Sequence, residues 1–218
     1  MSQDSKKDFS GRDIEHMLIS LISNKIKVLI IGGGRAGFIK AKSFARRGCS
    51  VTVVSIDFIE DFNSILNENI HLIRSEYISD FTVDTHLVVI AVSDEYLINN
   101  IKQDCEAQYK LYLCCNQSKN GLFIVPAAGE TEQGVFAFHT KNGSPATATF
   151  IRDKIHNQVK EYDAFVQYSC KLRSSLKGNM KLPEIMRFVN TEDFMMFFQN
   201  DKHQMILKLF YGGIDFED

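Results

Sequence analysis

Short apolar runs alternate with amphipathic stretches through the first half of the chain. The runs are rich in β-branched residues and end at glycine or polar residues, which is typical of buried strands. We expect strands at 26–31, 49–56, 70–77, 85–93 and 110–116. Helical spacing predicts helices at roughly 35–47, 58–66 and 95–108. Strands that alternate with helices build a doubly wound parallel sheet, so this half is predicted to be a Rossmann-like α/β domain.

The pattern changes near residue 120. Two extended segments with a turn-rich stretch between them predict a β-hairpin over 122–143. A single helical face then follows Pro145, formed by Ile151, Ile155, Val159, Tyr162 and Val166. Short helices are expected after it, with Thr191 as an N-terminal cap and Gly212-Gly213 as a stop. The predicted organisation is an N-terminal segment (1–23), the Rossmann-like domain (24–116), a hairpin-and-helix region (117–170) and a helical tail (171–218).

Composition and charge narrow the class of protein. The 218 residues are 44% hydrophobic and 24% charged, as in an ordinary globular protein. Twenty-five basic residues nearly balance 27 acidic ones, and a net charge of −2 offers no field to attract nucleic acid or an anionic membrane. No apolar run approaches the roughly 20 residues of a membrane helix, and the polar N-terminus does not resemble a signal peptide. We therefore expect a cytoplasmic protein.

The five cysteines and six histidines show no spacing typical of metal ligands. The cysteine number is odd, and two of the cysteines are adjacent in a predicted strand. We interpret them as reduced thiols of the core, and we expect no metal site.

A glycine-rich turn follows the first predicted strand and opens the first predicted helix. Gly32, Gly34 and Gly37 have the spacing of a dinucleotide-binding turn. In that turn the first glycine permits the bend, the second lets the backbone approach a pyrophosphate, and the third lets helix and strand pack closely. The helix N-terminus then offers free N–H groups to the phosphates. The predicted cofactor-binding segment is Gly32, Gly33, Gly34, Arg35, Ala36 and Gly37, although a purely structural corner is the alternative.

The second strand bears on the choice of cofactor. An acidic residue is expected about 20 residues after the turn, where it binds the ribose hydroxyls. The strand is predicted to end at Ser55, a hydroxyl residue, and Asp57 lies two residues beyond. No Arg or Lys directly follows the strand to bind a 2′-phosphate. We therefore expect NAD rather than NADP, with Ser55 and Asp57 near the ribose.

Four further stretches of the chain are informative together: GGGRAGFIKAKSFARRGCSVTVVS (32–55), AVSDEYLINNIK (91–102), FIVPAA (123–128) and NGSPATATFIRDKI (142–155). These four blocks resemble one family, the precorrin-2 dehydrogenases and the N-terminal module of siroheme synthases. The resemblance implies NAD-dependent oxidation of precorrin-2 to sirohydrochlorin, on the route to siroheme or cobalamin, with metal insertion in some members. It also implies a homodimer formed through the 117–170 region and a tetrapyrrole cleft near the nicotinamide. The last block argues against an unrelated Rossmann module.

One position departs from the family's pattern. The family's general base is an aspartate that closes the fifth strand, and counting back from Pro126 places Asn116 there. An amide cannot accept a proton near neutral pH, so the enzyme is expected to be impaired. Two alternatives stay open: a binding protein of the same fold that holds NAD or a tetrapyrrole without catalysis, and Asn116 as a simple strand-end cap.

Further candidates carry less weight. Asp94 ends the fourth strand on the side where ligands bind in open α/β sheets, but it can equally cap the next helix. His139 is placed in the second hairpin strand, either as a proton shuttle or as an interface residue. The resemblance places Ser93 near the cofactor and Thr140 and Ser144 near the tetrapyrrole. Lys119, Arg152 and Lys154 can meet the carboxylates of the tetrapyrrole, although for each one a solvated surface charge is the alternative.

Overall fold

The computed structural model describes residues 16–65 and 69–212. The described chain divides into two compact units, with the boundary between Val125 and Pro126. Most of the predicted N-terminal segment lies outside the described residues, and 16–22 has no regular structure.

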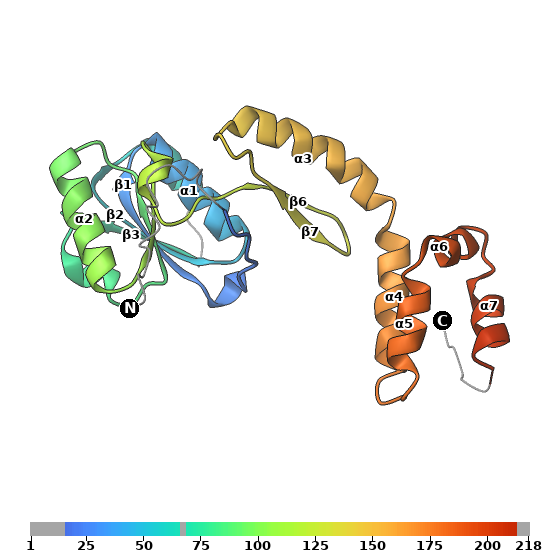
Figure 1. The fold of residues 1–218 in the computed structure, drawn as a ribbon. Helices are drawn as coiled ribbons and strands as arrows, with labels where there is room; N and C mark the ends of the chain where they lie inside the picture. Colours follow the sequence, from blue (N-terminus) through green and yellow to red (C-terminus); the bar gives the residue numbers. More distant parts are fainter. Residues whose placement is uncertain (1–15, 66–68, 213–218) are drawn as a thin grey trace, which may run out of the picture. The chain divides into compact units, whose positions relative to one another are not determined.

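The first unit contains a five-stranded, fully parallel sheet. Its strands follow the order β3-β2-β1-β4-β5, so the chain starts in the middle of the sheet and builds outward in both directions (Figure 1). The prediction of a doubly wound parallel sheet is confirmed. The strands are β1 (Lys27–Gly33), β2 (Ser50–Phe58), β3 (Ile70–Arg74), β4 (Leu87–Ile90) and β5 (Leu111–Cys114). The α-helices of this unit are α1 (Arg35–Arg46) and α2 (Glu95–Ala107).

The two faces of the sheet carry separate cores. Val28 and Ile30 of β1 point toward α1, while Leu29 and Ile31 alternate to the face that α2 covers. Alternation places successive side chains on opposite faces, and covering both faces buries all of them. The four residues of β4 are likewise buried throughout.

A short 3-10 helix takes the place of the helix expected between β2 and β3. The helix predicted at 58–66 is only η2 (Glu60–Ser64), and residue 66 lies outside the described residues. β2 continues to Phe58 rather than ending near Ser55, so the strand includes the first residue of the predicted helix. Phe62 fixes this turn: its ring is 1% exposed and packs edge-on against Phe38 and Phe58. The connection from β3 to β4 contains η3 (Ser79–Thr82). Further turns are η1 (Ser23–Lys25) and η4 (Ser118–Asn120).

The second unit begins with the predicted hairpin, formed by β6 (Ala127–Glu130) and β7 (Val135–Phe138). These strands are shorter than the extended segments of the sequence, and β7 ends one residue before His139. The helices that follow are α3 (Pro145–Lys160), α4 (Asp163–Ser175), α5 (Leu182–Val189), α6 (Glu192–Gln199) and α7 (His203–Phe210). Thr191 caps α6 as predicted, because its Oγ1 accepts a hydrogen bond from the Phe194 amide at 3.2 Å. Gly212 follows α7, and Gly213 lies outside the described residues.

The predicted continuous helix through Val166 is wrong. A turn at 161–162 separates α3 from α4. Asp163, the first residue of α4, accepts hydrogen bonds from the Thr131 hydroxyl at 2.7 Å and from the Glu132 and Gln133 amides at 3.2 Å. These hydrogen bonds lower the pKa of the Asp163 carboxyl, and the bond from the Thr131 hydroxyl contributes most. The tie to the hairpin turn is a tertiary contact, which the helical spacing alone cannot indicate.

Candidate dinucleotide site

Three glycines of the turn are required by the fold itself. Gly32 has a φ of +120°, and a Cβ there would lie 2.5 Å from the carbonyl oxygen of Ala91. A Cβ on Gly37 would overlap the carbonyl oxygen of Gly32, and one on Gly33 would overlap that of Asp57. At these positions glycine lets strand, helix and neighbouring strands approach closely.

Gly34 is different, because neither conformation nor packing requires a glycine there. Its φ of −85° and ψ of −170° are open to any residue. A Cβ at this position would meet no atom within 4 Å. The absence of a side chain at Gly34 therefore leaves open space in front of the first turn of α1. Such space fits a ligand that must approach the backbone, as a pyrophosphate does.

The N-terminus of α1 faces the same space. Gly34 is the N-cap and provides no side-chain cap, and the first helical bond runs from the Phe38 amide to the Gly34 carbonyl at 3.0 Å. The amides of residues 35–37 therefore precede the first intrahelical bond and have no intrahelical acceptor. Together with the positive end of the helix dipole, these amides suit an anionic group. The residues of the turn thus fit the phosphates of a dinucleotide.

Two exposed ion pairs flank the turn. Arg35 Nη1 lies 3.2 Å from Asp61 Oδ1, and Arg74 Nη1 lies 3.0 Å from Asp57 Oδ1. Ser55 is opposite Arg74 in the sheet register. The sequence pattern indicates Ser55 and Asp57 but not Arg74, because Arg74 belongs to the next strand, 17 residues beyond Asp57. The signal for Arg74 was its position as the last residue of the neighbouring strand.

Asn116 joins the ends of two strands. Its Nδ2 donates a hydrogen bond to the Val92 carbonyl at 3.0 Å, and it follows β5 by two residues. Asp94 is the N-cap of α2, where Oδ1 accepts from the Leu97 amide at 2.9 Å. Both residues are exposed and lie just beyond strand ends, as does Ser93. The contact of Asp94 is the helix cap expected as its alternative role, while the Asn116 side chain bonds to the segment that follows β4. Lys119 is exposed in η4.

The remaining predicted residues belong to the second unit. His139 is partly buried after β7. Thr140 and Ser144 close the turn that leads into α3, since the Ser144 amide donates to the Thr140 Oγ1 at 2.6 Å. The Ser144 hydroxyl lies 2.7 Å from that of Thr147. Arg152 donates to the Ala128 carbonyl at 3.2 Å and so ties α3 to the hairpin.

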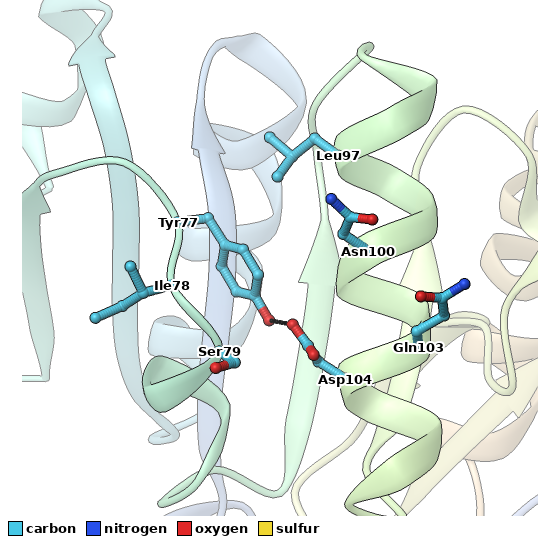
Figure 2. Close-up of a pocket in the computed structure, with 7 residues that line it drawn as sticks. All are labelled: Tyr77, Ile78, Ser79, Leu97, Asn100, Gln103 and Asp104. Atoms are coloured by element: carbon cyan, nitrogen blue, oxygen red, sulfur yellow. Dashed lines mark hydrogen bonds between the residues drawn. The ribbon is translucent and has the colours of Figure 1, made fainter.

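A separate open pocket of about 350 Å³ lies between α2 and the segment after β3. Figure 2 shows Tyr77 reaching across it, with its hydroxyl donating to Asp104 Oδ2 at 2.8 Å. Burial raises the pKa of Tyr77, and the bond to Asp104 adds to the effect, so the phenol stays protonated. None of the sequence-predicted residues lines this pocket. Its lining residues are Tyr77, Ile78, Ser79, Leu97, Asn100, Gln103 and Asp104.

Two classes of feature are absent from the described residues. No group of three or more His, Cys, Asp or Glu side chains among them could hold a metal ion. Within the same residues, no helix has the length and apolar character needed to cross a membrane.

The sheet order and the glycine turn together define a dinucleotide-binding α/β domain. A family model described as "Putative NAD(P)-binding" matches residues 19–127, which is half of the chain. The chain belongs to this family.

Two curated relatives carry names that match the resemblance found in the sequence. A "Siroheme synthase" of Psychrobacter cryohalolentis is 24% identical over 161 residues, covering 73% of this chain and 30% of the relative. A "Putative precorrin-2 dehydrogenase" of Methanocaldococcus jannaschii is 27% identical over 146 residues, covering 63% of this chain and 70% of the relative. The chain thus spans less than a third of the first relative's length.

A solved structure has the same fold. It is described as "SirC, precorrin-2 dehydrogenase", and it superposes with a TM-score of 0.66 at 18% sequence identity. The match covers 88% of this chain and 98% of the other. The likeness extends beyond the Rossmann-like sheet, because the covered part is much longer than the first unit.

Proposed function

We propose that this protein is a precorrin-2 dehydrogenase, which uses NAD to oxidise precorrin-2 to sirohydrochlorin in siroheme or cobalamin biosynthesis. The observation that carries the proposal is Gly34, a glycine that the fold does not need and that leaves open space before the α1 N-terminus. The names of the relatives and of the solved structure support the choice of substrate.

The chain's own residues would divide the work as follows. The turn from Gly32 to Gly37 would hold the pyrophosphate, and Asp57 with Ser55 would bind the ribose hydroxyls. An acid in that place favours NAD, because its charge repels a 2′-phosphate. When bound, NAD supplies the hydride acceptor, while the domain orients the two reactants. Thr140, Ser144 and Lys119 are the proposed tetrapyrrole contacts.

Proton removal is the weak step in this chain. We propose that Asn116 occupies the position of the family's base, with Asp94 and His139 as the other groups that could exchange a proton. Because an amide has no titratable lone pair near neutral pH, we expect slow turnover. The alternative is a protein that binds NAD or the tetrapyrrole without oxidation, and the identity of Asn116 is the observation that favours it.

We further propose a cytoplasmic homodimer assembled through the region 117–170. Apolar side chains on this region are exposed: Val135 by 73%, Phe150 by 59% and Tyr162 by 50%. An open pocket of about 620 Å³ lies at the break between α3 and α4, lined partly by Ile155 and Val159. A second copy of the chain would cover these surfaces. Sedimentation as a monomer at micromolar concentration would contradict the dimer.

Gly34→Val tests the dinucleotide site. The backbone at Gly34 accepts valine and the surrounding space is open, so the fold should keep its stability. The valine would occupy the space proposed for the pyrophosphate, and we expect NADH affinity to fall by about tenfold or more. Titration by NADH fluorescence measures the affinity, and thermal unfolding checks the fold.

Gly134→Val is the matched control. Gly134 lies in the hairpin turn, where a Cβ would stay at the ordinary contact distance of 3.6 Å from the Thr131 hydroxyl. It introduces the same side chain far from the glycine turn in sequence, in the other unit. NADH affinity should not change in this variant. A folded Gly34→Val protein that binds NADH as tightly as the original chain would refute the assignment.

A further inference from the structure

Arg74 and Asp57 form an ion pair at the carboxyl edge of the sheet. Arg74 is the last residue of β3, and Asp57 lies near the end of β2, the strand beside it. The guanidinium Nη1 is 3.0 Å from the carboxylate Oδ1. Seventeen residues separate the two in sequence. The sheet therefore places a cation beside the acid that we propose for the cofactor's ribose.

The carboxylate is fixed to the glycine turn through the backbone. Phe58 pairs with Gly33 in the sheet, and the Ile59 amide donates to the Gly33 carbonyl at 3.0 Å. The Asp57 carbonyl oxygen lies so close to Gly33 that a Cβ there would overlap it. Asp57 Oδ1 also accepts from the Phe58 amide at 2.9 Å. The backbone thus holds Asp57 beside the turn whether or not Arg74 is paired with it.

The arginine is held less firmly. Its side chain is 69% exposed and that of Asp57 is 83% exposed, and ion pairs at such exposure are weak. The guanidinium also lies 5.9 Å from the centre of the Phe58 ring, which keeps it near the strand ends when the pair opens. A phosphate monoester carries more charge than a carboxylate and binds arginine in a bidentate manner. A phosphate at this edge could therefore draw Arg74 away from Asp57.

We propose that Arg74 and Asp57 act as an opposed pair that sets the choice between NAD and NADP. Asp57 favours the ribose hydroxyls and engages Arg74, so that the intact chain prefers NAD. Loss of the Asp57 charge frees Arg74 to bind a 2′-phosphate. This inference rests on the proposed dinucleotide site, and it adds a specificity determinant from β3 to it.

The test is a set of NADH and NADPH titrations of the full chain by fluorescence. The original protein should bind NADH more tightly than NADPH. Asp57→Asn, which is nearly isosteric, should shift the affinity ratio toward NADPH by about tenfold or more. Arg74→Gln should leave NADH affinity within about twofold and weaken NADPH. The double variant Asp57→Asn with Arg74→Gln should lose the gain in NADPH affinity.

Asp61→Asn is the matched control, because it breaks the similar pair between Asp61 and Arg35 at the helix N-terminus. Arg35 is the first residue of α1 and would lie near the phosphates that both cofactors share, so the affinity ratio should not change. An unchanged ratio in Asp57→Asn, or a gain that survives in the double variant, would overturn the inference alone. If the original chain bound neither NADH nor NADPH, the proposed site and this inference would both be wrong.

Discussion

The substitution Asn116→Asp should restore a proton acceptor at the end of β5. In the structure the Asn116 amide donates to the Val92 carbonyl at 3.0 Å. An ionised aspartate cannot donate, so that bond is lost at a cost of about 1 kcal/mol. The side chain is exposed, and the new carboxylate can turn into solvent. The fold should therefore survive the exchange.

The expected gain is larger than this cost. A positioned general base contributes about 10²–10⁴-fold to a proton transfer. This corresponds to about 3–5 kcal/mol in the barrier. We expect sirohydrochlorin formation to rise by about 100-fold, the lower end of what a base supplies.

The assay follows sirohydrochlorin absorbance after anaerobic mixing of precorrin-2, NAD and protein. Asn116→Ala is the control, because it removes the bond to Val92 without adding a base, and it should not accelerate the reaction. The reasoning fails if Asn116→Asp folds, binds NADH normally and yet oxidises precorrin-2 no faster than the original chain. Asp94 and His139 would then be the next residues to replace.

Two further predictions concern stability. Gly37→Ala should lower the free energy of unfolding by about 1–3 kcal/mol, because its Cβ would overlap the Gly32 carbonyl oxygen. Urea unfolding measures this loss, and Gly34→Val in the same assay should not show it, because a Cβ at Gly34 meets no atom within 4 Å. Burial, aided by the bond to Glu106, raises the pKa of Tyr112 to about 12, above its unfolded value of about 10. The stability that the protonated Tyr112 phenol contributes is complete below about pH 10 and is lost as the pH rises toward 12. The unfolding free energy of the Tyr112→Phe variant should therefore fall less steeply than that of the original chain between about pH 9 and 11.5. An equally steep fall in the Phe variant would contradict this assignment.

Local signals in the sequence predicted much of the fold. The parallel strands and the glycine turn follow from short-range patterns, namely β-branched runs and the spacing of Gly32, Gly34 and Gly37. The capping role of Thr191 is equally local. These features need no knowledge of distant residues, so the sequence is enough to place them.

Contacts between distant residues account for what the sequence did not reveal. The break after α3 depends on Asp163 meeting the hairpin turn, about 30 residues earlier in the chain. Arg74 reaches Asp57 only because β2 and β3 are neighbours in the sheet. The sequence motif does not distinguish Gly34 from the glycines that the fold requires. That distinction depends on which atoms would surround a Cβ added at each position.

The central claim is that this protein oxidises precorrin-2 with NAD. The most direct measurement is to incubate the original chain and the Asn116→Asp variant with precorrin-2, with and without NAD, and to follow sirohydrochlorin. We predict slow formation by the original chain, faster formation by the variant, and none above the protein-free rate when NAD is omitted. If neither protein forms sirohydrochlorin faster with NAD than without it, the claim is wrong.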